Sequence, residues 1–75
     1  MSSRGEIQGN QMQVILPDRS TRTLAGNPRT IESLLAELGI RSSGVIVARN
    51  GVLVPDDAVA GGDDQVRIIR VAHGG

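Results

Sequence analysis

The chain contains no cysteine and no aromatic residue. Without cysteine it has no disulfide, no thiolate-bound metal and no cysteine nucleophile. Without phenylalanine, tyrosine or tryptophan it lacks the rings on which single-stranded nucleic acid stacks. Its eight basic residues are balanced by eight acidic ones, so no excess of positive charge indicates nucleic-acid binding. We therefore expect no bound cofactor, no metal and no direct contact with nucleic acid.

Long hydrophobic runs are also missing. No apolar stretch approaches the length of a membrane span or of a signal-peptide core. We therefore expect a cytoplasmic protein that makes no membrane contact and is monomeric when free. At 75 residues the chain forms one domain, near the lower limit for a core without disulfides or metal.

Side chains capable of catalysis occur singly. His73 is the sole histidine, and neither Ser42 nor Ser43 has an acid or a base in a plausible relation to it. The aspartates of the later loops are Asp56, Asp57, Asp63 and Asp64. They lack the alternating spacing and the closing glutamate of a calcium loop, so we interpret them as turn residues. No constellation here predicts an enzyme.

Alternating apolar residues predict strands near both ends of the chain. In QMQVILP, Met12, Val14 and Leu16 share one face, and the proline ends the strand. STRTLAG (20–26) then returns to close a hairpin. QVRIIRV (65–71) alternates in the same way and predicts the last strand.

The middle of the chain carries the clearest helix pattern. Four apolar residues at i, i+3, i+4 and i+7 predict a helix between 30 and 39. They are Ile31, Leu34, Leu35 and Leu38. Thr30 provides an N-cap, and Gly39 provides a left-handed stop.

After the helix, GVIVARNGVLVP places two β-branched runs around Asn50-Gly51, a strong hairpin signal. The turn-rich segment that follows leaves room for one helical turn at 56–59. The order of the predicted strands and helix indicates an α+β protein, with a mixed sheet of four to five strands crossed by one helix. This is the β-grasp, or ubiquitin-like, fold. We expect a disordered leader at 1–10, the β-grasp domain at 11–71 and a flexible diglycine tail at 72–75.

Strand periodicity also predicts a docking surface. If Val66 and Ile68 face the helix, alternate residues of the same strand face away from it. The neighbouring strand 45–49 behaves alike. The predicted partner-binding residues are Ile46, Ala48, Ile69 and Val71, edged by Arg67. An exposed apolar patch with a polar rim commonly marks a binding site, although scattered apolar surface residues are also normal.

Residues 44–75, GVIVARNGVLVPDDAVAGGDDQVRIIRVAHGG, resemble the C-terminal half of the ThiS/MoaD family of ubiquitin-like sulfur carriers. The shared features are a valine-rich strand, a VP step, an acidic loop, an Asp-x-Val strand and a final Gly-Gly. TIESLLAELGI also matches the family's helix, so the resemblance covers about residues 11–75. The ending IIRVAHGG is similar to that of the small archaeal modifier proteins.

The resemblance implies a mechanism centred on Gly75. An adenylating enzyme of the ubiquitin-activating type uses ATP to convert the Gly75 carboxylate into an acyl adenylate, and a persulfide sulfur displaces AMP to leave a thiocarboxylate. Gly74 keeps the reacting end free of side chains, and His73 belongs to the spacer. The implied recipient is a downstream synthase or thiolase serving thiamin, thiolated tRNA or molybdopterin, and conjugation to proteins through isopeptide bonds is a further implied use.

A second hypothesis is an interaction-only β-grasp domain whose diglycine end is incidental. The chain reaches both glycines directly after a core strand, and this arrangement favours the carrier. Glycine at such a place adds nothing to packing, which indicates that the end has a chemical purpose.

Overall fold

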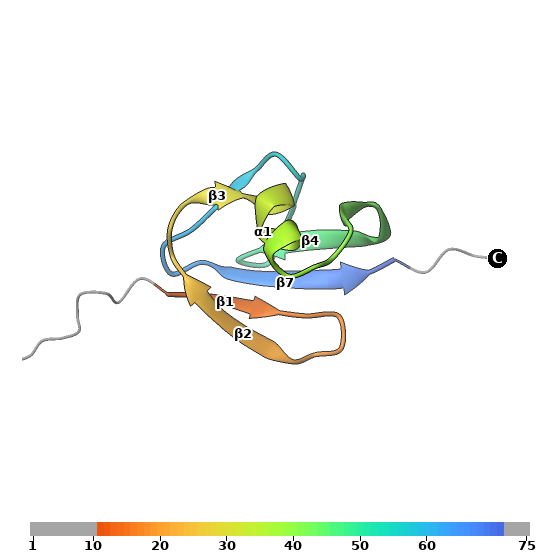
Figure 1. Ribbon diagram of the computed structural model, residues 1–75, viewed down its shortest axis with the longest axis horizontal. Coiled ribbons are helices and arrows are strands. Elements are labelled where there is room, and N and C mark those ends of the chain that lie inside the picture. Colours follow the sequence, from red (N-terminus) through yellow and green to blue (C-terminus); the bar gives the residue numbers. More distant parts are fainter. Residues whose placement is uncertain (1–10, 72–75) are drawn as a thin grey trace, which may run out of the picture.

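The computed structural model describes residues 11–71, which form a five-stranded sheet with one α-helix packed across it (Figure 1). The leader predicted at 1–10 and the tail predicted at 72–75 lie outside the described residues. The elements are β1 (Gln11–Ile15), β2 (Thr21–Ala25), β3 (Arg29–Thr30), α1 (Ile31–Glu37), the 3-10 turn η2 (Ser42–Gly44), β4 (Val45–Arg49), β5 (Val52–Val54), β6 (Val59–Ala60) and β7 (Gln65–Arg70).

The last strand, β7, lies in the middle of the sheet, whose order is β2-β1-β7-β4-β5. It pairs in parallel with β1, where Val14 lies opposite Val66, and antiparallel with β4, where Val47 lies opposite Ile68. The two edge strands each form an antiparallel hairpin with their neighbour, β2 with β1 and β5 with β4. The mixed sheet and its crossing helix confirm the β-grasp fold predicted from the sequence.

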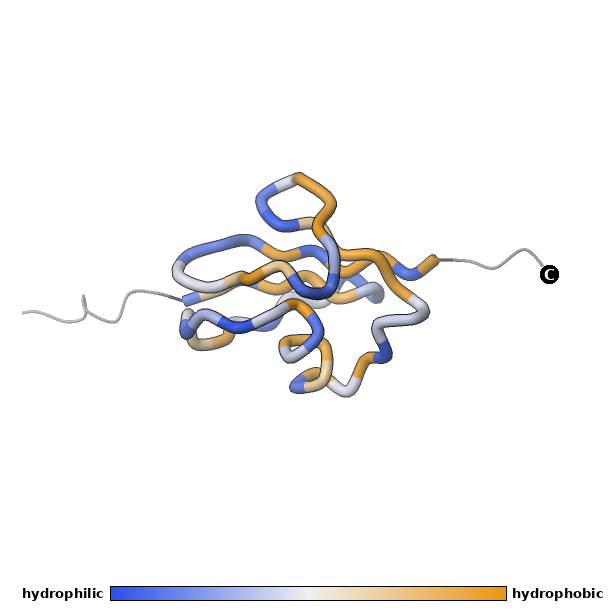
Figure 2. Tube along the Cα trace, turned by 90° about the horizontal axis from the view of Figure 1, so that it is seen from above, coloured by the Kyte–Doolittle hydropathy of each residue, from blue (hydrophilic) through white to orange (hydrophobic). Residues whose placement is uncertain are grey.

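Alternation along the central strands separates a buried face of the sheet from an open one. Met12 and Val14 of β1 are fully buried, and Val66 and Ile68 of β7 are buried with them. Figure 2 shows apolar residues along the strands and hydrophilic residues at several of the turns. Because successive strand residues point to opposite faces, the residues between these four face away from the helix.

The β4–β5 hairpin turns at Asn50 and Gly51, as predicted. Both residues have positive φ, at 54° and 85°. A two-residue type I′ turn requires such values, and asparagine followed by glycine adopts them with little strain. The turn sets the register of the ladder, in which Ala48 lies opposite Leu53.

Helix α1 begins at the predicted cap and ends a little before the predicted limit of residue 39. The Thr30 hydroxyl accepts a hydrogen bond from the Ser33 amide at 3.1 Å, which satisfies one free donor of the first turn. The helix ends at Glu37, and Gly39 follows with a φ of +73°, the left-handed conformation expected there. Among residues 11–71, no helix combines the length and the hydrophobicity needed to cross a membrane.

The core lies between α1 and the sheet and is built from aliphatic side chains and one methionine. Its buried members are Met12, Val14, Ile31, Leu34, Leu35, Val47, Ala60, Val66 and Ile68. Leu38, the last apolar residue of the predicted helical stripe, is only partly buried and packs at the margin. The rest of that stripe, Ile31, Leu34 and Leu35, is therefore what holds the helix to the sheet.

The helical turn expected at 56–59 is wrong. A β-turn leads instead into β6, which pairs with β3. The carbonyls of Asp56 and Ala58 accept hydrogen bonds from the amides of Glu32 and Ile31, at 3.0 and 2.9 Å. These amides belong to the first turn of α1 and have no partner within the helix. The loop therefore stays non-helical because its carbonyls complete the start of α1.

Asp64 ties the start of β7 to the β4–β5 turn. Its carboxylate accepts hydrogen bonds from the Asn50 side-chain amide at 3.0 Å and from the Gly61 backbone amide at 3.1 Å. Asn50 accepts in turn from the amide of Gln65 at 2.9 Å. The Asn50 and Gly61 donors hold the pKa of the Asp64 carboxyl below its ordinary value. At least this aspartate of the acidic loops thus has a structural role.

We expect Leu34→Ala to lower the free energy of unfolding by about 2–5 kcal/mol, because it opens a cavity in the core. Leu38→Ala makes the same chemical change at a partly buried position and should cost clearly less. Urea denaturation followed by circular dichroism measures both values. Equal losses, or an unchanged midpoint for Leu34→Ala, would contradict the packing of α1 against the sheet.

The hydrogen bonds of Asp64 predict a pH dependence of stability. Because its pKa is lowered on folding, the carboxylate stabilises the fold above the unfolded-state pKa of about 3.9, and this contribution disappears as the pH falls through the folded pKa. Asp64→Asn should therefore be less stable than the parent at neutral pH, and the difference should shrink as the pH falls below about 4. Asp63→Asn, at the exposed neighbouring position, is the matched control. A difference that stays constant across denaturant titrations at neutral and acidic pH would refute this role.

Candidate partner-binding site

Strand β7 leads directly to the predicted tail. Val71 follows β7, and its amide donates a hydrogen bond to the Gly44 carbonyl at 3.1 Å, which fixes the chain one residue beyond the strand. Figure 1 shows this strand leaving one end of the sheet. The predicted tail residues His73, Gly74 and Gly75 lie outside the described residues. The surfaces around Val71 are therefore the parts of the described body nearest to the tail.

Four of the five predicted docking residues share the face of the sheet opposite to α1, namely Ile46, Ala48, Arg67 and Ile69. The register places Ile46 opposite Ile69 and Ala48 opposite Arg67 across β4 and β7. Ile46, Ile69 and Val71 keep 42%, 38% and 39% of their surface exposed, which is high for aliphatic side chains in a sheet. The structure thus brings four of the predicted residues together, whereas Val71 lines a different hollow, described below. Their role in partner binding stays a prediction.

Ala48 differs from the others because it is only 8% exposed. It lies on the predicted face, but its methyl group is surrounded by larger neighbours and offers little surface to a partner. Four residues absent from the predicted set also line this face, namely Ile15, Gly51, Leu53 and Gln65. Leu53 lies opposite Ala48 in β5, and Ile15 lies opposite Arg67 in β1. The alternation of residues in β1 is sufficient to predict that Ile15 faces away from the helix. The position of Leu53 could be predicted only with the register that the β4–β5 turn sets.

These residues form one surface with a shallow hollow of about 320 Å³. We call it the open face, and its members are Ile15, Ile46, Ala48, Leu53, Gln65, Arg67 and Ile69. Leu53 is the most exposed of the aliphatic members, at 62%. The open face is mainly aliphatic, with Gln65 and Arg67 as its polar members, so it fits an apolar protein surface better than a charged one.

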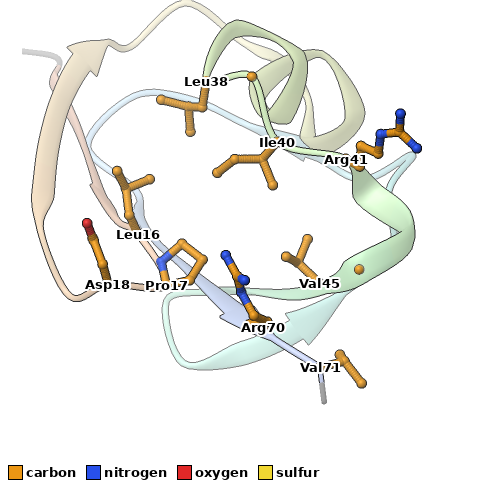
Figure 3. A pocket seen from close by; sticks show the side chains of 11 residues that line it. Leu16, Pro17, Asp18, Leu38, Ile40, Arg41, Val45, Arg70 and Val71 are labelled. Carbon is orange, nitrogen blue, oxygen red and sulfur yellow. The ribbon is translucent and has the colours of Figure 1, made fainter. Parts of the chain in front are cut away.

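A second hollow, of about 550 Å³, lies on the other side of the β7 exit (Figure 3). It is bounded by the β1–β2 turn, the segment between α1 and β4, and the end of β7. We call it the tail-base pocket, and its principal residues are Leu16, Leu38, Ile40, Val45, Arg70 and Val71. In Figure 3 the four aliphatic side chains before Arg70 surround the opening. No local sequence pattern indicates this pocket, because its walls come from segments far apart in the chain.

The charged groups at the tail-base pocket differ in whether they have a hydrogen-bond or ion-pair partner within residues 11–71. They are Asp18, Arg41 and Arg70. The Asp18 carboxylate accepts hydrogen bonds from the Ser20 hydroxyl at 2.6 Å and the Ser20 amide at 2.9 Å, and these bonds lower its pKa. The ion pair found within residues 11–71 joins Arg29 to Glu37 at 2.6 Å. Arg70 therefore has no carboxylate partner in the described part of the chain.

The fold defines a ubiquitin-like β-grasp domain with an apolar face beside its last strand. A sequence model of the ThiS family matches residues 10–75, nearly the whole chain and the tail with it. The chain belongs to the ThiS family, which confirms the resemblance found in the sequence. Its members are small sulfur carriers rather than enzymes, and they interact with adenylating enzymes and sulfur-transfer partners. A comparison with curated proteins returned no match.

Proposed function

We propose that this chain carries sulfur as a thiocarboxylate on Gly75. The Gly75 carboxylate attacks the α-phosphorus of ATP, pyrophosphate leaves, and an acyl adenylate forms. The sulfur of a persulfide then attacks the acyl carbon, and AMP leaves as an acyl disulfide forms. A thiol cleaves the sulfur–sulfur bond of that intermediate, which frees the thiocarboxylate and leaves the donor as a disulfide. An enzyme of the ubiquitin-activating type binds the ATP, so the carrier itself needs no cofactor.

The observation that carries this proposal is that the family match runs through Gly75 itself. The described body supports it, because β7 delivers the chain to the tail from a strand that is paired on both edges. The body contributes surfaces for docking, and the chemistry is assigned to the tail. We place this cycle in the cytoplasm, with the carrier monomeric between partners.

Glycine at the last two positions suits this chemistry. The adenylating enzyme must bring the Gly75 carboxylate, the α-phosphate and later a sulfur nucleophile within about 3–3.5 Å of one another. Neither Gly74 nor Gly75 has a Cβ, so no side chain obstructs the approach of nucleotide or sulfur. Ala72 and His73 form the spacer between the docked body and the reacting end.

The proposed recipient of the sulfur is a downstream synthase or thiolase. The open face has no aromatic residue, which favours thiamin synthesis or tRNA thiolation over molybdopterin synthesis as the pathway served. The same acyl adenylate would also allow transfer of Gly75 to a lysine amine on another protein. The chain contains no lysine, so another copy of it offers no side-chain amine for that reaction.

We expect the chain to gain the mass of one oxygen replaced by sulfur when it is incubated with its adenylating enzyme, ATP and a persulfide donor. Mass spectrometry should map the change to the C-terminal peptide, and a reaction without ATP is the control. Gly74→Val or deletion of Gly75 should abolish the gain, because each displaces or removes the reacting carboxylate. Both changes lie beyond the described body, so the melting temperature should match the parent. If the Gly75-deleted chain still supports sulfur transfer in cells that lack the parent, the diglycine is incidental and the interaction-only hypothesis replaces this one.

We expect Ile69→Asp to weaken binding to the adenylating enzyme while the fold stays intact, because Ile69 is on the open face and outside the core. Ile69 keeps 38% of its surface exposed, so burying that part at an interface contributes about 0.6–1.1 kcal/mol. Burying an aspartate without a partner costs about 1–3 kcal/mol more, so Kd should rise by at least about tenfold. Isothermal titration calorimetry measures the loss. Val52→Asp is the matched control, since Val52 is exposed but lies on the opposite side of its strand from Leu53. Equal binding by Ile69→Asp and the parent would show that the open face does not contact this enzyme.

A further inference from the structure

We propose that the tail-base pocket is a second docking site, which binds an aliphatic side chain of the enzyme acting on Gly75 together with an adjacent carboxylate. The aliphatic side chain enters between Leu38, Ile40 and Val45, and the carboxylate pairs with Arg70. The identity of the partner rests on the proposed function. The chemistry of the ligand rests on the pocket alone.

The walls of the pocket account for the aliphatic half of the ligand. Leu16, Leu38, Ile40 and Val45 pack against the core with one side and leave the other toward the hollow of about 550 Å³. Pro17 closes the β1 side with a ring of restricted conformation (Figure 3). An apolar side chain placed there removes aliphatic surface from water on both partners, which favours its binding.

Arg70 is the reason for proposing a carboxylate in the ligand. Its side chain rises between Pro17 and Val45 in Figure 3, at the edge of the opening. No carboxylate within residues 11–71 pairs with it, and the nearby Asp18 carboxylate is already bonded to Ser20. A guanidinium pairs with a carboxylate through charge-assisted hydrogen bonds, often two in parallel. The ligand that completes this site is therefore anionic next to its apolar group.

The position of the pocket identifies the partner. Val71 lines the pocket, and four residues separate its place in the chain from the end of Gly75. Four residues span at most about 13–14 Å when fully extended. An enzyme whose active site holds Gly75 thus has its surface beside the pocket. The tail itself is a poor occupant, because Ala72 to Gly75 contain no large aliphatic side chain.

The pocket and the open face lie on opposite sides of the same strand. Ile69 turns to the open face, whereas Arg70 turns to the helix side, where it lines the pocket. A partner that contacts both surfaces holds the last strand from two sides just before the tail. Each surface offers aliphatic side chains together with one arginine of β7, which is Arg67 on the open face and Arg70 at the pocket.

A titration with short peptides tests the site directly. The full chain, labelled with ¹⁵N, is titrated with acetyl-Gly-Leu-Glu-Gly-amide and followed by NMR. Two matched probes carry Gln in place of Glu or Ala in place of Leu. We expect the amide signals of Ile40, Gly44 and Val45 to shift with millimolar affinity, and each matched probe to bind about tenfold more weakly, as the loss of one charged hydrogen bond or one buried side chain predicts.

Arg70→Glu should remove the preference for Glu over Gln, and Arg67→Glu, on the same strand but the other face, should keep it. Arg70 is exposed, so the variant should retain the parent's dispersed spectrum. Absence of shifts at the pocket, shifts confined to the open face, or equal binding of the Glu and Gln probes would each overturn the proposal. So would pocket signals that move on dilution of the free chain, since the occupant would then be a second copy. A chain without residues 72–75 that binds the Glu probe at least about tenfold more tightly than the parent would show that the tail occupies the pocket, and this too would overturn the proposal.

The sulfur test on Gly75 remains separate. Sulfur gain without peptide binding would refute the pocket while leaving the carrier function in place. Peptide binding without sulfur gain would support the ligand chemistry of the pocket and refute the function from which its partner is named.

Discussion

The pairing of β7 on both of its edges is the constraint on which the rest of the structure depends. The strand pairs in parallel with β1 and antiparallel with β4, and Val66 and Ile68 bury its inner face against α1. The last strand is therefore central to the sheet rather than at its edge. Since the chain leaves the body from this strand, its exit is held by the core and not by a surface loop. Binding of a partner to the body therefore also fixes where the tail begins relative to that partner.

Two surfaces result from this arrangement, one on each side of the exit. The open face exists because a single helix covers only one side of a five-stranded sheet. The tail-base pocket exists because α1 ends at Glu37, which leaves Leu38 and Ile40 to line a hollow beside β7. A short helix in a small domain thus creates both candidate docking sites. The absence of aromatic residues makes both sites aliphatic, and each has one arginine of β7. The pocket differs in having two further charged residues at its edge, Asp18 and Arg41.

Local patterns predicted most of the fold because their causes are local. Thr30 caps its own helix, and Asn50-Gly51 forms its own turn, so a few neighbouring residues were sufficient evidence. The β3–β6 pairing could not be predicted, because it depends on distant carbonyls that complete the first turn of α1. The burial of Ala48, the place of Leu53 and the tail-base pocket likewise depend on register between strands. The candidate site was thus predicted on β4 and β7, where alternation sufficed, and missed wherever separate segments meet.

The central claim is that the folded body presents a Gly75 carboxylate for adenylation. Exchange of labelled pyrophosphate into ATP, catalysed by the adenylating enzyme, measures that step before any sulfur is involved. The assay compares the intact chain with a free peptide of residues 70–75 at equal concentration. Exchange supported by the intact chain and not by the peptide would match the account. Equal exchange with both would show that the body is dispensable, and absence of exchange with the intact chain would show that Gly75 is not the group activated.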